Sequence, residues 1–164
     1  MRIKRIASFL SLLSMGLLAG HSVAMYFFIA PGMMGLSAKA FVEVNTIAEP
    51  LFEKSVPLLF LVVFVSLVTW MAAIYKNWKS AEFIHLSFAL LCFVDQLYVT
   101  YQASMPLNII MTSWKKTHDL PPQWFTLREE WASIMSYHLA LSLTAFVLLI
   151  LAHHQQKTKP LSPA

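Results

Sequence analysis

Two histidines and one aspartate lie inside long apolar stretches of this chain: His21, Asp95 and His138. An ionisable side chain in hydrocarbon is costly unless it finds a partner, so such residues usually serve structure or chemistry. Histidine is well suited to accept and return a proton near neutral pH, and a carboxylate beside it can orient its ring. The three residues are therefore the candidates for acid–base chemistry.

These residues share one expected depth. Each lies eight or nine residues inside the outer end of its apolar stretch, the three ends being Ala30, Ala103 and Glu130. With a helical rise of about 1.5 Å per residue, all three lie roughly 12–14 Å below the same membrane surface. We therefore expect them to converge in one polar layer.

The composition indicates that these apolar stretches lie in a lipid bilayer. Of the 164 residues, 58% are hydrophobic and 12% are charged, whereas a soluble domain has about 25% charged residues. Four stretches reach the length of about 20 residues that crosses a bilayer; they are residues 6–30, 55–75, 81–103 and 131–152. The expected fold is all-α: an antiparallel, up-down, four-transmembrane-helix bundle. It forms a single integral membrane domain over residues 1–164, with a polar tail at 153–164.

Basic residues predict the orientation of this bundle. They concentrate in short segments at one end, at residues 2–5, 76–79 and 157–159. The positive-inside rule then places both termini in the cytoplasm, with a bacterial inner membrane as the expected location. The N-terminal run also looks like a secretory signal, but it continues to Ala30, so we expect a retained spanning helix.

Charge and cysteine content exclude some classes of protein. A net charge of +4, with the basic residues at the ends of apolar runs, does not indicate nucleic-acid binding. The single cysteine, Cys92, cannot form an intramolecular disulfide, and no cysteine-rich metal motif is present in the sequence.

The connection after the first stretch is expected to form an amphipathic helix over residues 36–52, distorted in its last turn by Pro50. Asn45 falls in the centre of its apolar face, between Phe41 and Phe52. Two interpretations remain open: an interfacial helix with one tolerated amide, or a cap on the bundle with Asn45 pointing inward. A lipid-facing Asn has no partner, which favours the outer cap helix.

The polar layer itself has three interpretations. Asp95 and Tyr98 share one face of the third span, and His138 shares a face of the fourth with Trp131. In the structural interpretation, Asp95 bonds one histidine and the network only fixes helix register. In the functional one, the layer is the floor of a pocket entered from the outer side, with a histidine as general base. In the third, a cofactor binds: His21, Asp95 and His138 match a non-haem iron set, and two histidines can ligate haem. No local motif supports a cofactor, and none is predicted.

Short motifs in a fixed order carry a family resemblance. They are Gly16 to Gly20 with Pro31-Gly32, Asn45 with Pro50-Leu51-Phe52, Met105-Pro106-Leu107-Asn108, and Trp114, Trp124, Arg128 and Trp131. Over most of its length the chain resembles the small four-helix membrane proteins grouped as anthrone-oxygenase-like, many of which have no known function. The resemblance implies a bundle with a polar pocket at the outer helix ends. The residues it places around that pocket are Asn45, Asn108, Trp124, Arg128 and Trp131.

Some members of that family look like oxygenases that convert an anthrone to an anthraquinone without a recognised metal or flavin motif. Loss of a proton from the carbon between the rings leaves an enolate that can pass an electron to dioxygen. The resemblance then suggests His138 or His21 as the base, amide and Arg128 donors for the oxyanion, and tryptophans as stacking partners. The fourth span departs from the family, because Met135 and His138 stand where relatives carry a His and, three residues later, an Arg. This exchange changes the pH response of the site.

The expected function is a small oxidoreductase acting on a hydrophobic aromatic or quinone-like molecule that partitions from the membrane. A non-catalytic accessory or lipid-binding protein, and a haem- or metal-binding redox protein, are the alternatives. The expected partners are the bilayer and a hydrophobic small molecule, and not nucleic acid. A second copy of the chain or a membrane complex remains open as a protein partner.

Overall fold

The computed structural model describes residues 2–117 and 122–157, and these residues are helical with short turns and contain no strand. The elements are α1 (Arg2–Ala24), η1 (Met25–Ile29), α2 (Ala30–Met34), α3 (Ala38–Ala73), η2 (Tyr75–Asn77), α4 (Ala81–Val99), η3 (Thr100–Ser104), α5 (Met105–Thr117) and α6 (Trp124–Lys157). Four segments are long and apolar enough to cross a membrane: Arg2–Met34, Lys54–Ala73, Ala81–Trp114 and Trp124–Gln156. The predicted all-helical chain with four potential membrane spans is confirmed.

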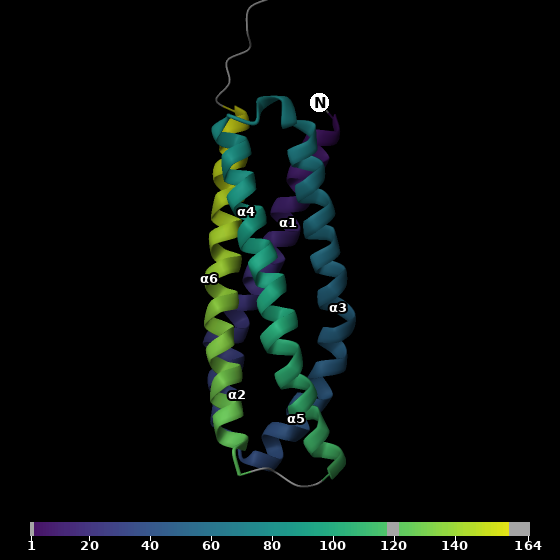
Figure 1. Cartoon of the computed structure of the whole chain (residues 1–164), viewed down its shortest axis with the longest axis vertical. Coiled ribbons are helices and arrows are strands. Elements are labelled where there is room, and N and C mark those ends of the chain that lie inside the picture. Colours follow the sequence, from purple (N-terminus) through teal and green to yellow (C-terminus); the bar gives the residue numbers. More distant parts are fainter. Residues whose placement is uncertain (1, 118–121, 158–164) are drawn as a thin grey trace, which may run out of the picture.

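The four long helical segments lie side by side (Figure 1). The start of α1, the η2 turn and the end of α6 lie at one end of the bundle, and α2, α5 and the start of α6 lie at the other. Helix α4 packs along α6, and α1 packs against both α3 and α6, whereas α3 and α4 contact each other over a shorter stretch. The bundle is therefore least tightly closed between α3 and α4.

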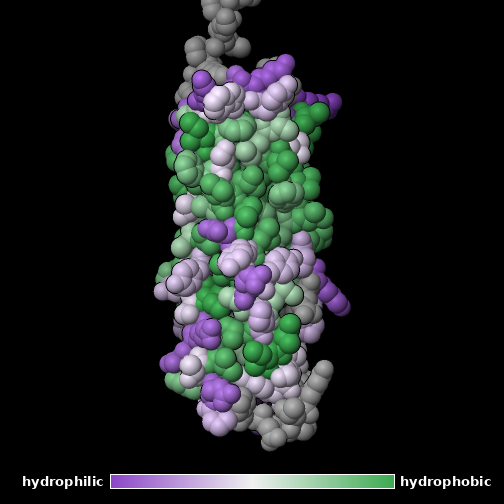
Figure 2. Space-filling view, in the orientation of Figure 1, coloured by the Kyte–Doolittle hydropathy of each residue, from purple (hydrophilic) through white to green (hydrophobic). Residues whose placement is uncertain are grey.

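Two apolar clusters fill the interior. One, towards the η2 end, includes Trp70, Leu86 and Phe93; the other, towards the α5 end, includes Phe41 and Trp131. The surface is also largely apolar, and Figure 2 shows hydrophobic side chains over most of the half nearer η2, with hydrophilic ones gathered at its tip. Contact between so large an apolar surface and water is unfavourable. This distribution therefore suits a molecule surrounded by lipid.

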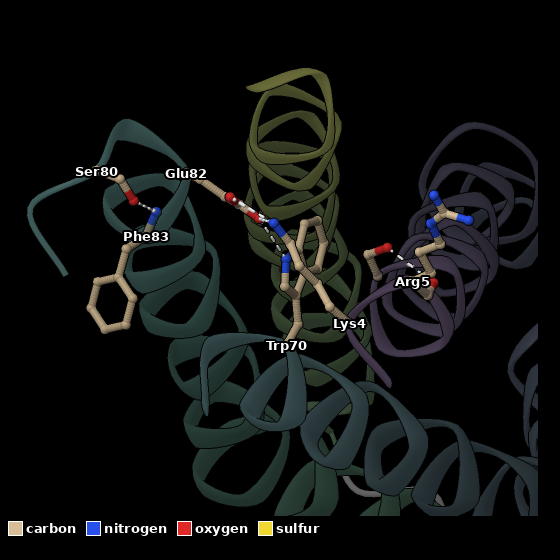
Figure 3. A network of polar contacts seen from close by, with 7 residues as sticks. Lys4, Arg5, Trp70, Ser80, Glu82 and Phe83 are labelled. Carbon is tan, nitrogen blue, oxygen red and sulfur yellow. Dashed lines mark hydrogen bonds and ion pairs between the residues drawn. The ribbon is translucent and has the colours of Figure 1, made fainter. Parts of the chain in front are cut away.

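A partly buried ion pair joins three helices at the η2 end (Figure 3). Glu82 is 8% exposed, and its carboxylate lies 2.8 Å from Lys4 Nζ of α1. Trp70 of α3 donates from Nε1 to the same carboxylate at 2.9 Å. Ser80 caps α4 beside it by accepting a hydrogen bond from the Phe83 N–H at 3.2 Å. The Lys4 ammonium and the Trp70 N–H thus replace the hydrogen bonds that the buried Glu82 carboxylate would otherwise make with water.

Helix α3 differs from the prediction, because the expected amphipathic helix and the second span form one continuous helix of 36 residues. Ser37 caps its start and accepts a hydrogen bond from the Ala40 N–H. Pro50 and Pro57 both lie inside it. Each proline removes one backbone donor but does not end the helix, since neighbouring helices support such interruptions in membrane proteins. A separate outer helix over 36–52 is thus not observed as an independent element.

Two other prolines also fail to end their helices. The expected ends near Pro31 and at Ala103 are wrong, because the first helix continues through α2 and the third through α5. In each case a π-helical turn, η1 or η3, precedes the proline by two residues. A π turn accommodates the missing N–H and the displaced carbonyl without breaking the helix. The fourth helix also starts earlier, at Trp124, and extends to Lys157. The remainder of the predicted polar tail, residues 158–164, lies outside the described residues.

Candidate functional site

A cavity of about 450 Å³ opens between the helices in the half of the bundle nearer α5. This volume lies within the range of about 300–1,000 Å³ that is usual for small-molecule sites. Its walls are mostly apolar and aromatic side chains, including Phe52, Phe60 and Trp131. The polar residues that line it come from all four long helical segments: His21, Ser22, Asn45, Gln96, Thr100, Ser104, Asn108 and His138.

His138 is held by a serine from the facing helix. Its Nε2 lies 2.9 Å from Ser104 Oγ, and Ser104 is the last residue of the π turn η3. Ser104 is 8% exposed and His138 is half-buried. The hydroxyl can donate to Nε2 or accept from it. When Nε2–H donates to the serine, the second ring nitrogen carries the lone pair and can accept a proton.

Three amides on the cavity wall have buried polar atoms with no hydrogen-bond partner among the described residues. They are Asn45 Nδ2, Gln96 Oε1 and Asn108 Oδ1, and they come from α3, α4 and α5. Leaving a buried donor or acceptor unpaired costs about 1–3 kcal/mol each. Three such atoms around one cavity leave it with hydrogen-bonding groups that water or a bound polar group can satisfy.

The second histidine of the cavity is shielded by an aromatic ring. His21 is half-buried, and its ring centroid lies 5.4 Å from that of Phe52 at an angle of 58°. Phe52 belongs to α3 and is itself 37% exposed. His21 thus faces the cavity beside an aromatic side chain that also reaches its surface.

Arg128 and Trp124 lie outside this cavity, so the prediction that they line the pocket is wrong. Arg128 is 4% exposed, and its Nη1 donates to the Leu36 carbonyl at 2.9 Å. Its guanidinium carbon lies 4.6 Å from the Trp124 ring centroid and 5.0 Å from that of Phe125. The guanidinium is therefore engaged in joining the start of α6 to the segment between α2 and α3.

Asp95 and Tyr98 also do not line the cavity. Both are exposed on α4, Tyr98 by 65%, while the adjacent Gln96 is 2% exposed and lines the cavity. One residue corresponds to a rotation of about 100° around a helix, which is sufficient to exchange an inward for an outward direction. The predicted convergence therefore holds for His21 and His138 but is wrong for Asp95.

A polar pattern in the third span could have located the cavity face. Gln96, Thr100, Ser104 and Asn108 follow one another at intervals of four residues, and all four line the cavity. Residues four apart share one face of a helix. Of these four residues only Asn108 was predicted, through the family resemblance; the other three are uncharged, and the ionisable Asp95 was taken to mark the inward face instead.

The proposed iron set is not assembled. Among the described residues, no group of three or more His, Cys, Asp or Glu side chains is placed to hold a metal ion. His21 and His138 share the cavity, but the carboxylate of Asp95 faces the outer surface of α4. The described residues therefore do not bring two histidines and Asp95 together around one point.

Comparisons of the chain with protein-family models, with curated proteins and with solved structures give no significant match. The resemblance to the anthrone-oxygenase-like proteins therefore stays a prediction. A function must be argued from the cavity itself.

Proposed function

We propose that this protein is a bacterial inner-membrane protein that binds a hydrophobic aromatic or quinone-like molecule and oxidises it in an oxygenase-like reaction. Its spans form an antiparallel up-down bundle with both termini in the cytoplasm, and the first turns of α3 close the outward-facing cavity. The observation that carries the proposal is the cavity with apolar walls, His138 and three amides, each of which has one buried atom unpaired among the described residues. An apolar body with a few hydrogen-bonding groups is the ligand that such a lining favours.

The mouth of the cavity supports entry from the bilayer. Four residues that line the cavity are also exposed, and they belong to α3, η3 and α5: Phe52, Pro57, Tyr101 and Met105. The lining residues from α1 and α6 are buried or half-buried and form the back wall. Pro57 and Tyr101 both lie within membrane-spanning segments. A ligand dissolved in the membrane therefore reaches the site between α3 and the α4–η3–α5 segment.

The amides define the polar part of this ligand. The side chains of Asn45, Gln96 and Asn108 each offer a donor and an acceptor, so they suit a ring that carries carbonyl and hydroxyl groups. Trp131 is 4% exposed and contributes an aromatic surface to the same cavity. Hydrogen bonds at the ring oxygens and aromatic contacts along the ring plane would orient a flat molecule.

His138 is the proposed base. It removes a proton from the carbon between the rings of an anthrone-type substrate, and the unpaired amide donor of Asn45 stabilises the oxyanion of the resulting enolate. The enolate passes one electron to dioxygen, and the two radicals combine to a peroxide that takes a proton back from His138. Loss of one water then leaves the ketone, so that one substrate and one dioxygen give one quinone and one water.

A second candidate function is binding without catalysis. It is favoured by one observation: no carboxylate of the described residues orients His138, since Asp95 faces the other way. A serine partner fixes the ring direction without adding charge. The same cavity would then serve to hold or deliver a membrane-soluble molecule.

Oxygen uptake by the purified protein in lipid nanodiscs tests these functions. With anthrone as the probe, we expect dioxygen consumption and anthraquinone formation above the uncatalysed rate, together with quenching of Trp131 fluorescence on binding. His138→Gln should keep the quenching and lose the turnover. His154→Gln, at an exposed position of the same helix outside the cavity, is the matched control and should change neither.

The outcomes separate the two functions. Quenching without turnover in the unaltered protein would support the binding function and reject the oxygenase. Absence of both quenching and turnover with anthrone and with anthraquinone would reject the quinone-like ligand class altogether.

A further inference from the structure

A line of exposed residues follows α4 and continues into η3, on the side opposite to the cavity. Ile84, Phe88, Leu91, Asp95, Tyr98 and Gln102 are all exposed, and they are spaced alternately by four and three residues. This spacing is the pattern by which one helix packs against another along a single seam. We name this line the α4 seam. No described residue of the chain forms a hydrogen bond or ion pair with Asp95, Tyr98 or Gln102.

The polar half of the seam lies inside the membrane-spanning segment Ala81–Trp114, with Asp95 near its middle. On the face that Figure 2 shows, hydrophilic side chains interrupt the apolar surface about halfway along the bundle. An aspartate at the centre of a bilayer costs about 2.5–3.5 kcal/mol on insertion scales. Its side chain is too short to reach the headgroups, unlike that of Lys or Arg. A polar partner must therefore cover it.

We propose that the α4 seam is the contact between two copies of this chain in the membrane. Two copies with the same orientation are related by a two-fold axis along the membrane normal, so each seam residue meets residues of its own depth. Helical side chains lean towards the helix N-terminus, which brings the Tyr98 hydroxyl to the level of Asp95. The hydroxyl of one copy can then donate to the carboxylate of the other.

The remaining seam residues complement this pairing. Gln102 can both donate and accept, so it pairs with the same residue of a second copy without any charge. Ile84, Phe88 and Leu91 extend the contact as an apolar strip, with Phe88 55% and Leu91 61% exposed. The two Asp95 carboxylates meet at one depth and repel each other, and the two Tyr98 hydroxyls, one donating to each carboxylate, offset this repulsion. With these hydrogen bonds the seam can pair with a second copy of itself. This interface does not depend on the function proposed for the cavity.

Disulfide cross-linking in the bilayer tests the seam. The full chain carries Cys92→Ala to remove its only cysteine, and Leu91→Cys to place one on the seam without touching its polar residues. Mild oxidation should shift this protein from the monomer to the dimer mass. Val147→Cys, 52% exposed on α6, is the matched control and should stay monomeric. Adding Asp95→Leu to Leu91→Cys should abolish the shift, and Asp95→Asn should retain it.

Three results would overturn the proposal. The Leu91→Cys protein could remain monomeric while it is folded, or Val147→Cys could cross-link equally well. Alternatively, in native membranes the Leu91→Cys protein could link to a band of another mass, which would assign the seam to a different membrane protein. The unaltered protein, with Cys92 half-buried beside the seam, gives the background of random linkage.

Discussion

Pro31 and Pro106 hold the same place relative to a π-helical turn: each follows the last residue of its turn by two positions. Both turns adjoin the cavity, since Met25 begins η1 and Ser104 ends η3, and both residues line it. A π turn shifts all later side chains around the helix axis. The turn η3 therefore sets the direction in which Met105 and Asn108, which follow it, face the cavity, whereas the lining residues of the first helix precede or begin η1.

The first prediction concerns Pro106→Ala. Restoring the backbone donor should let η3 relax to a regular α-helix and draw Ser104 away from His138, a bond of 2.9 Å in the present structure. Loss of one hydrogen bond of about 0.5–1.5 kcal/mol should weaken ligand affinity roughly 2- to 10-fold. Fluorescence titration measures this. Pro50→Ala, an exposed helix-interior proline that does not line the cavity, should leave the affinity unchanged.

The second prediction concerns the unpaired amide of Asn45. Asn45→Leu removes a buried donor without a partner, so the ligand-free protein should gain stability by about 1–3 kcal/mol. The same change should weaken binding of a carbonyl-bearing ligand. Thermal unfolding in detergent with and without anthraquinone compares the two effects. A destabilised ligand-free protein would show that Asn45 has a partner that the fold depends on.

The third prediction concerns Arg128→Lys. The change keeps the charge but loses the planar group that contacts Trp124 and Phe125 and bonds the Leu36 carbonyl. We expect a loss of stability of about 1.5–3 kcal/mol, the range for a hydrogen bond to a charged group. Chemical denaturation of the purified protein measures it. Because Arg128 lies outside the cavity, the affinity of the remaining folded protein should not change, and a selective loss of affinity would argue against this placement.

The fourth prediction concerns the ion pair of Lys4 and Glu82. A double-mutant cycle with Lys4→Gln and Glu82→Gln should give a coupling of about 0.5–3 kcal/mol, as for other contacting charged residues. The Lys4 side chain is 27% exposed, so solvent screening should keep the value in the lower part of this range. Glu82→Leu should cost more than Glu82→Gln because it also removes the acceptor of Trp70. Equal losses of unfolding free energy for Glu82→Leu and Glu82→Gln would show that the hydrogen bond from Trp70 does not contribute to stability.

Much of the helical organisation could be predicted from the sequence, because apolar length is a direct consequence of bilayer thickness. Helix boundaries at proline could not, since a proline ends a helix in water but can be absorbed by a π turn within a bundle. The inward direction of His21 and His138 was predicted correctly. The outward direction of Asp95 was not, because the distance from the end of an apolar stretch gives only its depth, while its rotation depends on how α4 packs against α6.

The same limit explains the error at Arg128. The family resemblance placed it around the pocket, and it does lie at that end of the bundle, on α6 near the α2–α3 junction. Arg128 joins the start of α6 to the segment between α2 and α3, and this role depends on the Leu36 carbonyl and on three aromatic rings from two separate helices. Contacts between residues so far apart in the sequence produce no local sequence pattern, so they could not be predicted.

Helix α4 carries one polar face inward, through Gln96, and another outward, through Asp95, and the two residues are neighbours in sequence. The angular position of this one helix therefore decides which polar set the cavity contains. A rotation by about 100° would exchange the amide for the carboxylate. A contact that holds the outer, Asp95-bearing face of α4 in place therefore also determines which hydrogen-bonding group lines the cavity. Such a surface contact can change which ligand the cavity prefers without contacting that ligand.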